Sequence, residues 1–259
     1  MLHSYPGCLL FLCPVIFIAG FIDSIAGGGG LLTLPAYVLT GMPLTTVYGT
    51  NKFVSCTGTL FGAANYIRKG CVTWLVAVPA LVGSLIGSWC GAQMALHLSQ
   101  NVLKICLIVI LPVVALFMIL NPGFGKEESD KPMHRKSLTV LFGFLIGLVI
   151  GCYDGFFGPG TGMFLTMAFV LLERLDLIHA TGTTKIANLA SNFAALIAYL
   201  IAGVVDFKIG LPCMVCSIAG NIIGSQFAIE KGTKFIKIVM ICVSILMLVK
   251  IVIDFFVKK

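Results

Sequence analysis

The sequence predicts an all-α protein that crosses a membrane many times, and two observations carry this prediction. Of its 259 residues, 59% are hydrophobic and 10% are charged, and the mean hydropathy is +1.07. A soluble domain is typically about 45–50% apolar and about 25% charged, so this chain has too few charges to cover a surface in water. The second observation is a series of apolar runs, most of them close to the ~20 residues that a membrane-spanning helix needs.

Eight long apolar runs are the predicted spans: Cys8–Ala26, Val47–Ile67, Val72–Leu96, Val102–Leu120, Leu138–Tyr153, Thr183–Ala202, Ile209–Ile229 and Phe235–Val257. Two shorter runs, Leu31–Leu39 and Met163–Leu172, follow glycine-rich segments. As straight helices rising ~1.5 Å per residue, neither would cross a hydrocarbon core of ~30 Å. We expect them to be half-helices.

The chain repeats itself. At an offset of 133 positions, identical residues include Gly49 and Gly182, Lys52 and Lys185, Tyr66 and Tyr199, Pro79 and Pro212, Ser84 and Ser217, and Gln93 and Gln226. At an offset of 131, Asp23 matches Asp154, Gly27 matches Gly158 and Gly29 matches Gly160. Polar residues and a proline are among the matches, so apolar composition does not explain them. The sequence predicts two homologous repeats, a common build for secondary transporters.

A charged segment, NPGFGKEESDKPMHRK, separates the repeats. It divides the chain into a first transmembrane repeat (1–120), a cytoplasmic linker (121–136) and a second repeat (137–259). The net charge of +7 fits Lys and Arg gathered in cytoplasmic loops. No basic stripe stands apart from the spans, so we expect no nucleic-acid partner.

Two topologies are open. If each short run shares a crossing with the helix before it, there are eight crossings, arranged 4+4 in parallel. If each short run completes a crossing of its own, there are ten, and the 5+5 halves are inverted. One topology places Lys231 and Lys234 on the cytoplasmic side, and the other places Lys208, Lys258 and Lys259 there. The positive-inside rule therefore does not decide between them. Inverted repeats among known transporters favour 5+5.

Asp23 precedes four consecutive glycines in the stretch GFIDSIAGGGGLLTLP, and the second repeat has DGFFGPGTG in its place. Non-helical backbone survives in a membrane only where it is buried or lines a cavity. Each break also frees a helix N-terminus, whose N–H groups favour anions. The predicted substrate-binding residues of the breaks are Gly27, Gly28, Gly29, Gly30, Gly158, Gly160, Thr161 and Gly162. Close helix packing through small residues is the alternative.

The repeated Gly-Thr-x-Lys element supplies the rest of the predicted site. Lys52 and Lys185 lie in apolar runs, where a lysine is costly and is a functional candidate; snorkelling to the interface is the alternative. The predicted hydrogen-bond donors beside them are Thr50, Asn51, Thr183 and Thr184. Further along the same helices, Ser55, Asn188, Ser191 and Asn192 are candidates for lining the path, with helix–helix hydrogen bonds as the alternative.

Asp23 and Asp154 have two interpretations. A carboxylate at this depth would carry a proton and couple transport to a proton gradient. Alternatively, each caps the N–H groups of its own break or pairs with a lysine. The histidines lack the spacing of metal ligands, so we expect no metal and no cofactor.

These motifs together resemble the sulfite exporter TauE/SafE family of membrane transporters. The residues that carry the resemblance are the two glycine-rich stretches, the elements at 49–52 and 182–185, and Y-I-R-K-G at 66–70. The resemblance covers nearly the whole chain. It implies a multi-pass protein of the inner or cytoplasmic membrane that moves sulfite, sulfonates or other small organic anions.

The function expected from the sequence is therefore a secondary carrier, an exporter of a small anion, with the anion and membrane lipid as partners. An anion channel of the same architecture is open as an alternative. An intramembrane enzyme would need a nucleophile with a base, or a metal set, so we expect no enzyme. Whether the chain forms a homo-oligomer is open.

Overall fold

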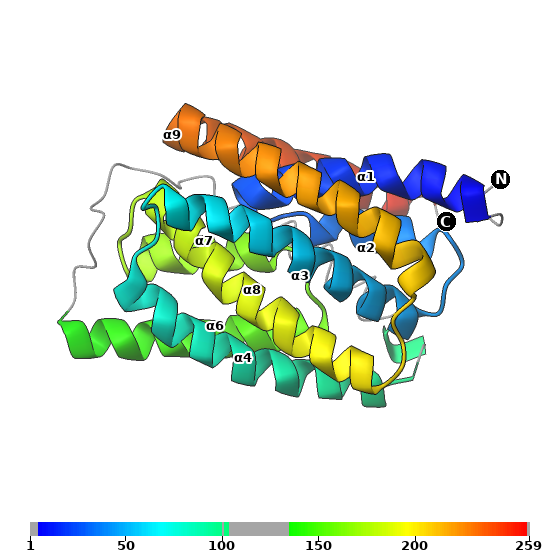
Figure 1. The fold of residues 1–259 in the computed structure, drawn as a ribbon, viewed down its shortest axis with the longest axis horizontal. Helices are drawn as coiled ribbons and strands as arrows, with labels where there is room; N and C mark the ends of the chain where they lie inside the picture. Colours follow the sequence, from blue (N-terminus) through cyan, green and yellow to red (C-terminus); the bar gives the residue numbers. More distant parts are fainter. Residues whose placement is uncertain (1–4, 100, 104–134, 258–259) are drawn as a thin grey trace.

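The computed structural model describes residues 5–99, 101–103 and 135–257, and this part of the chain is a bundle of helices (Figure 1). The first half contains α1 (Tyr5–Ala26), α2 (Gly30–Val38), α3 (Leu44–Arg68) and α4 (Trp74–His97). The second half contains α6 (Lys136–Phe156), α7 (Thr161–Leu172), α8 (Leu177–Ile201) and α9 (Phe207–Val257). Gly232 interrupts α9 with a positive φ of 72°.

Five of the described helices are long and apolar enough to cross a membrane: α1, α4, α6, α8 and residues 207–236 of α9. The predicted span Val47–Ile67 falls inside α3, which is helical and long but also carries Asn51, Lys52 and Arg68. The predicted span Val102–Leu120 and the linker 121–136 lie almost entirely outside the described residues. The two short apolar runs form the short helices α2 and α7, each directly after a glycine-rich break.

Two helix pairs pack backbone to backbone through glycines. In α4 and α6, a Cβ added to Gly151 would lie 2.7 Å from the Cα of Ser84. In α1 and α9, a Cβ added to Gly20 would lie 2.8 Å from the carbonyl oxygen of Ser217. Without water to drive apolar association, close approach through small residues is how helices pack in a membrane. The two contacts involve residues that match at the offsets of 131 and 133.

Polar contacts also recur at these offsets. The hydroxyl of Tyr66 donates to the carbonyl of Ser24 at 2.9 Å, and that of Tyr199 donates to the carbonyl of Gly155 at 3.4 Å. The amide of Thr73 donates to Thr183 Oγ1 at 3.1 Å, and the amide of Asp206 donates to Thr50 Oγ1 at 2.9 Å. Each tyrosine bond lies within one half, and the two bonds to threonine join the halves reciprocally, as an internal duplication predicts.

Matching helices run in opposite directions (Figure 1). In that view α1 and α3 begin at the right, whereas α6 and α8 begin at the left. Helices α3 and α8 contact one another, and each also packs on a helix of the other half, α9 and α4 respectively. These two helices carry the predicted lysines, so the predicted site lies where the halves meet.

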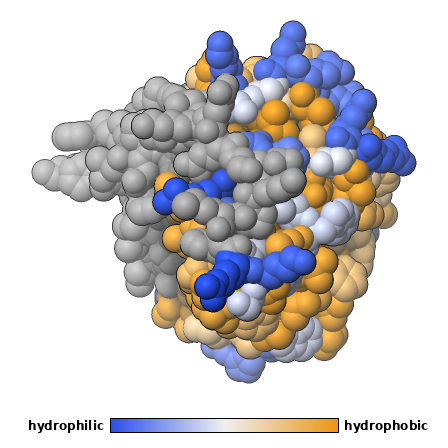
Figure 2. All heavy atoms as spheres, turned by 90° about the vertical axis from the view of Figure 1, so that its left-hand side faces the viewer, coloured by the Kyte–Doolittle hydropathy of each residue, from blue (hydrophilic) through white to orange (hydrophobic). Residues whose placement is uncertain are grey.

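One end of the bundle is rich in basic side chains. Seven exposed lysines and arginines end or begin helices there: Arg68, Lys69, Arg135, Lys136, Arg174, Lys231 and Lys234. Figure 2 looks onto this end and shows hydrophilic side chains beside broad hydrophobic surface. At the opposite end of the described chain, Lys208 is the exposed lysine, near the start of α9.

Candidate functional site

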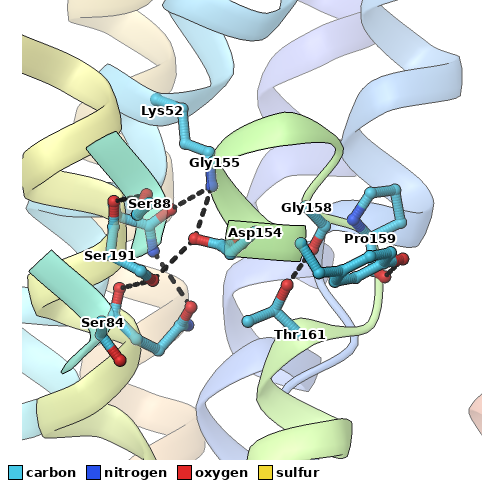
Figure 3. Close-up of polar contacts among 12 residues, drawn as sticks. Lys52, Ser84, Ser88, Asp154, Gly155, Gly158, Pro159, Thr161 and Ser191 are labelled. Atoms are coloured by element: carbon cyan, nitrogen blue, oxygen red, sulfur yellow. Dashed lines mark hydrogen bonds and ion pairs between the residues drawn. The ribbon is translucent and has the colours of Figure 1, made fainter. Parts of the chain in front are cut away.

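Lys52 and Asp154 form a buried ion pair between the two halves (Figure 3). Lys52 Nζ, from α3, lies 2.7 Å from Asp154 Oδ2 near the end of α6, and each side chain is 3% exposed. The hydroxyl of Ser191 donates to the same carboxylate oxygen at 2.6 Å, and Lys52 also donates to Asn192 Oδ1 at 3.0 Å. The carboxylate and the ammonium are therefore both satisfied by partners on α3, α6 and α8.

Lys185 and Asp23 form the matching pair. Lys185 Nζ, from α8, lies 3.0 Å from Asp23 Oδ2 and also donates to the backbone carbonyl of Asp23. The other carboxylate oxygen of Asp23 accepts from the amide of Gly29 at 3.2 Å, inside the first break. Lys185 is 0% exposed and Asp23 is 18% exposed. Asp23 therefore caps its own break and pairs with a lysine at once.

Both lysine ammonium groups are held inside the bundle. Lys52 is eight residues into α3 and Lys185 is eight residues into α8. At ~1.5 Å per residue each is about 12 Å along a helix of about 37 Å. Because α3 and α8 run in opposite directions, the two ammonium groups enter the bundle from opposite ends. Each reaches the break of the other half.

The threonines of the Gly-Thr-x-Lys elements are engaged elsewhere. Thr50 and Thr183 accept the backbone bonds described above, from residues just ahead of α9 and α4. Asn51 Oδ1 accepts from the hydroxyl of Thr33 on α2 at 2.6 Å. Thr184 Oγ1 accepts from the hydroxyl of Thr166 on α7 at 3.0 Å. In this state these four residues attach the neighbouring helices to α3 and α8.

The two breaks touch each other. A Cβ added to Gly27 would lie 2.5 Å from the Cα of Gly162, and one added to Gly162 would lie 2.5 Å from the Cα of Gly27. Gly27 also has a φ of +77°, which disfavours any other residue. Gly30 faces Pro159, whose Cα would lie 3.3 Å from an added Cβ. These glycines are therefore needed for close packing between the breaks.

The remaining break residues shape the turns. Gly158 and Gly160 have φ of +94° and +79°, and Thr161 donates to the carbonyl of Gly158 at 2.8 Å. The carbonyl of Gly28 accepts from the amide of Leu31 at 3.1 Å. A Cβ on Gly158 would lie 3.5 Å from Lys52 Nζ, so the second break and the lysine of the first half are adjacent.

A small cavity lies beside Asp23. Its lining comes from α1, α2, α3 and α9, with room of about 20 Å³ for the centres of water molecules. The polar residues that line it besides Asp23 are Thr33, Ser55, Thr59, Ser217 and Asn221. Of these, the sequence singled out only Ser55 as a candidate for lining a path. The identity of Ser217 with Ser84 across the repeat was the available signal, but a hydroxyl in an apolar helix is common enough to be passed over.

Comparison with known proteins agrees with this architecture. The family sulfite exporter TauE/SafE matches residues 12–251. A Sinorhizobium protein named probable membrane transporter protein ORF9 is 37% identical over 95% of this chain and 93% of its own length. Escherichia coli YfcA, another named probable membrane transporter, is 34% identical over 96% of this chain and 90% of its own.

A Haemophilus influenzae membrane transporter of the same description is 33% identical, over 95% of both chains. No solved structure matches the chain. The family and the names of these relatives indicate a transporter rather than an enzyme. With its apolar helices, the chain is a membrane transporter, and it belongs to the sulfite exporter TauE/SafE family.

Proposed function

We propose that the protein is a secondary carrier that exports small sulfur-containing or organic anions, such as sulfite or sulfonates. The anion binds between the two glycine-rich breaks, near the middle of the membrane. The observation that carries this proposal is the reciprocal pairing of Lys52 with Asp154 and of Lys185 with Asp23. Two ammonium groups inside a membrane, each beside a glycine-rich break that leads into the N-terminus of a short helix, suit a small oxyanion.

The charges constrain how the anion binds. In the described state each lysine has an aspartate as its counterion, so neither ammonium is free to attract a second negative charge. An anion must therefore displace a carboxylate from its lysine. Displacement is easier where the carboxylate is partly exposed, since its loss of the ammonium is then compensated by water.

The architecture extends this proposal to topology. The opposite directions of α1 and α6, and of α3 and α8, support two inverted repeats of five segments each, although the predicted span Val102–Leu120 lies almost entirely outside the described residues. The seven basic residues at one end of the bundle support the cytoplasmic assignment of that end. The N-terminus would then face the opposite side of the cytoplasmic membrane.

Reporter fusions test the topology. A cytoplasm-active reporter joined within the 68–73 loop is expected to be active, and the same reporter in the 202–206 loop inactive. The opposite pattern would reverse the assigned orientation. Activity at both loops would contradict it altogether.

Transport is tested in liposomes that contain the purified protein. The wild type is expected to take up radiolabelled sulfite, or a sulfonate that competes with it, with saturation. A Lys52→Ala/Lys185→Ala variant and a Gly29→Leu/Gly160→Leu variant, each shown to be folded, are expected to lose this uptake. Uptake linear in concentration would favour a channel. Normal uptake in both variants would show that neither the breaks nor the lysines belong to the binding site.

A further inference from the structure

Electroneutrality sets a condition on anion binding at either lysine–aspartate pair. Each pair is neutral as it stands, and Lys52, Lys185 and Asp154 are at most 3% exposed. A monoanion that joined such a pair would bring an uncompensated charge into a poorly hydrated interior, which is costly. A proton that binds the displaced carboxylate cancels that charge. The question is which of the two aspartates takes it.

Asp154 is poorly placed to change its protonation. Its Oδ2 accepts two short bonds, from Lys52 and from Ser191, and its side chain is sealed from water. A proton arriving at this oxygen would have to displace the ammonium of Lys52 or the hydroxyl of Ser191, and burial of the side chain keeps water from the other oxygen. The Lys52–Asp154 pair, with Ser191, therefore serves as a fixed link between α3, α6 and α8.

Asp23 is placed to receive a proton. It is 18% exposed and lines the cavity, whose room of about 20 Å³ is enough for about one water molecule. Asn221 also lines this cavity; it is 2% exposed, and its Oδ1 lacks a hydrogen-bond partner among the described residues. A buried acceptor of this kind is expected to bind a water. The hydroxyls of Ser55 and Thr59 provide further partners for that water.

Few charged groups face Asp23. Lys185 approaches it from α8, and Tyr66 approaches from α3 with its hydroxyl on the carbonyl of Ser24. The facing groups from the first break and from α9 are neutral: the amide of Gly29, and the side chains of Ser217 and Asn221. Lys185 is therefore the cation whose departure from Asp23 would decide its protonation.

The two halves differ in sequence at positions beside the cavity. The position of Ser191, whose hydroxyl binds Asp154, is occupied by Gly58 in the first half. At the position of the first half that matches Asn221, the residue is Ser88. A Cβ on Gly58 would lie 2.2 Å from Ser217 Oγ and 2.6 Å from Asn221 Nδ2, so glycine here leaves room for two side chains that line the cavity.

We propose that Asp23 is the proton-binding carboxylate of anion–proton cotransport and that Lys185 is the ammonium that receives the anion. This inference rests on the proposed carrier function and adds the coupling ion to it. A proton passes from water in the cavity to a carboxylate oxygen of Asp23, and an O–H bond forms. Lys185 stays protonated, releases Asp23 and donates its hydrogen bonds to the anion. One monoanion and one proton then cross together with no net charge.

Such a carrier responds to concentration and pH gradients and not to membrane potential when it carries a monoanion. An anion that accumulates inside the cell is exported down its own gradient together with a proton. With acid outside, the same cycle runs inward. Liposomes allow each gradient to be imposed alone.

The test uses methanesulfonate, which remains a monoanion throughout the usable pH range, and sulfite as a second probe. In wild-type proteoliposomes, an acid-outside gradient is expected to drive methanesulfonate accumulation, and a potassium diffusion potential is not. An Asp23→Asn variant is expected to lose the accumulation driven by pH. It should still exchange labelled for unlabelled methanesulfonate, because asparagine imitates the protonated state. An Asp154→Asn variant that exchanges is expected to keep the pH-driven accumulation.

A second variant tests the cavity without touching the ion pair. Gly58→Ser/Asn221→Ser replaces these two residues by serine, the residue found at both matching positions, Ser191 and Ser88, and reduces the space beside Asp23. Exchange in this variant shows that it is folded, and its pH-driven accumulation is expected to fall below that of the wild type. Unchanged accumulation would contradict the role of the cavity.

Other outcomes overturn the assignment. Accumulation driven by a sodium gradient and not by pH would make the coupling ion sodium. Exchange without a response to pH in the wild type, or loss of the response in Asp154→Asn but not in Asp23→Asn, would contradict the role of Asp23. If the wild type exchanges neither methanesulfonate nor sulfite, the proposed function itself fails, and the cotransport inference fails with it.

Discussion

The two glycine-rich breaks occupy matching positions but are held in different ways. The second break, Gly158–Gly162, contains Pro159, whose carbonyl accepts from the hydroxyl of Tyr153 at 2.6 Å. Its Thr161 also donates to Gly158, and its neighbour Asp154 is bound by Ser191 (Figure 3). All these partners fix its shape.

The first break, Gly27–Gly30, lacks these constraints. Ile22 stands where the second half has Tyr153, Gly28 where it has Pro159, and Gly30 where it has Thr161. Asp23 takes the place of Asp154 but lies beside a cavity instead of a serine hydroxyl. The comparison shows that matching positions of a duplicated chain can carry different contacts, and we propose that the first break, beside the cavity, is the one that moves during binding and release.

The largest expected difference between the halves is in stability. Asp154→Asn leaves Lys52 buried without a carboxylate and is expected to lower the free energy of unfolding by about 3–5 kcal/mol. Asp23→Asn is expected to cost less, because water in the cavity replaces part of the lost interaction. Thermal or denaturant unfolding of the detergent-solubilised protein measures both. Equal losses of unfolding free energy, or a larger loss for Asp23→Asn, would contradict the proposal that the second break is held more firmly than the first.

The contact between the breaks is the next test. Gly27→Ala places a methyl group against Gly162 and is expected to cost about 1–3 kcal/mol through overpacking. Gly41→Ala is the matched control, because Gly41 has a similar φ of +82° but nothing within 4 Å of an added Cβ. Both variants bear the strain of a positive φ, so the difference in their unfolding free energies isolates the packing. Equal destabilisation would show that the breaks do not touch.

The smallest expected effect concerns the hydrogen bond from the Tyr153 hydroxyl to the carbonyl of Pro159. Tyr153→Phe removes the hydrogen bond to its carbonyl and is expected to cost about 0.5–1.5 kcal/mol. Tyr5→Phe removes an equivalent bond to the carbonyl of Lys208 at the exposed end of α1 and is the control. Unfolding of the two variants should differ, since water replaces the lost bond only at Tyr5. Identical midpoints would mean that the bond does not hold the second break.

Much of this fold is predictable from the sequence because hydrophobic length and glycine content report directly on helices in a membrane. The short runs after the breaks are short helices, and the polar residues of the predicted site gather near the breaks. The repeat in the sequence also predicts which positions of the two halves are equivalent, and residues at the offset of 133 make matching contacts.

The sequence does not show that each lysine pairs with the aspartate of the other half. The patterns around Asp23 and Lys185 say that each is embedded, but not that an aspartate of one repeat meets the lysine of the other. The cavity was equally hidden, because its polar lining includes Asp23, Ser55 and Asn221 from helices distant in sequence. Substrate binding is predicted for Thr50 and Thr183 of the repeated element, and in this state their hydroxyl oxygens accept from backbone amides.

Hydrogen–deuterium exchange at the two breaks tests the division of labour most directly. Peptides that contain Gly27–Gly30 are expected to exchange faster than those that contain Gly158–Gly162, because the first break lies beside the cavity and the partly exposed Asp23. Addition of sulfite is expected to slow exchange at the first break. Equal exchange at the two breaks, faster exchange at the second, or protection by sulfite at the second alone would contradict the account.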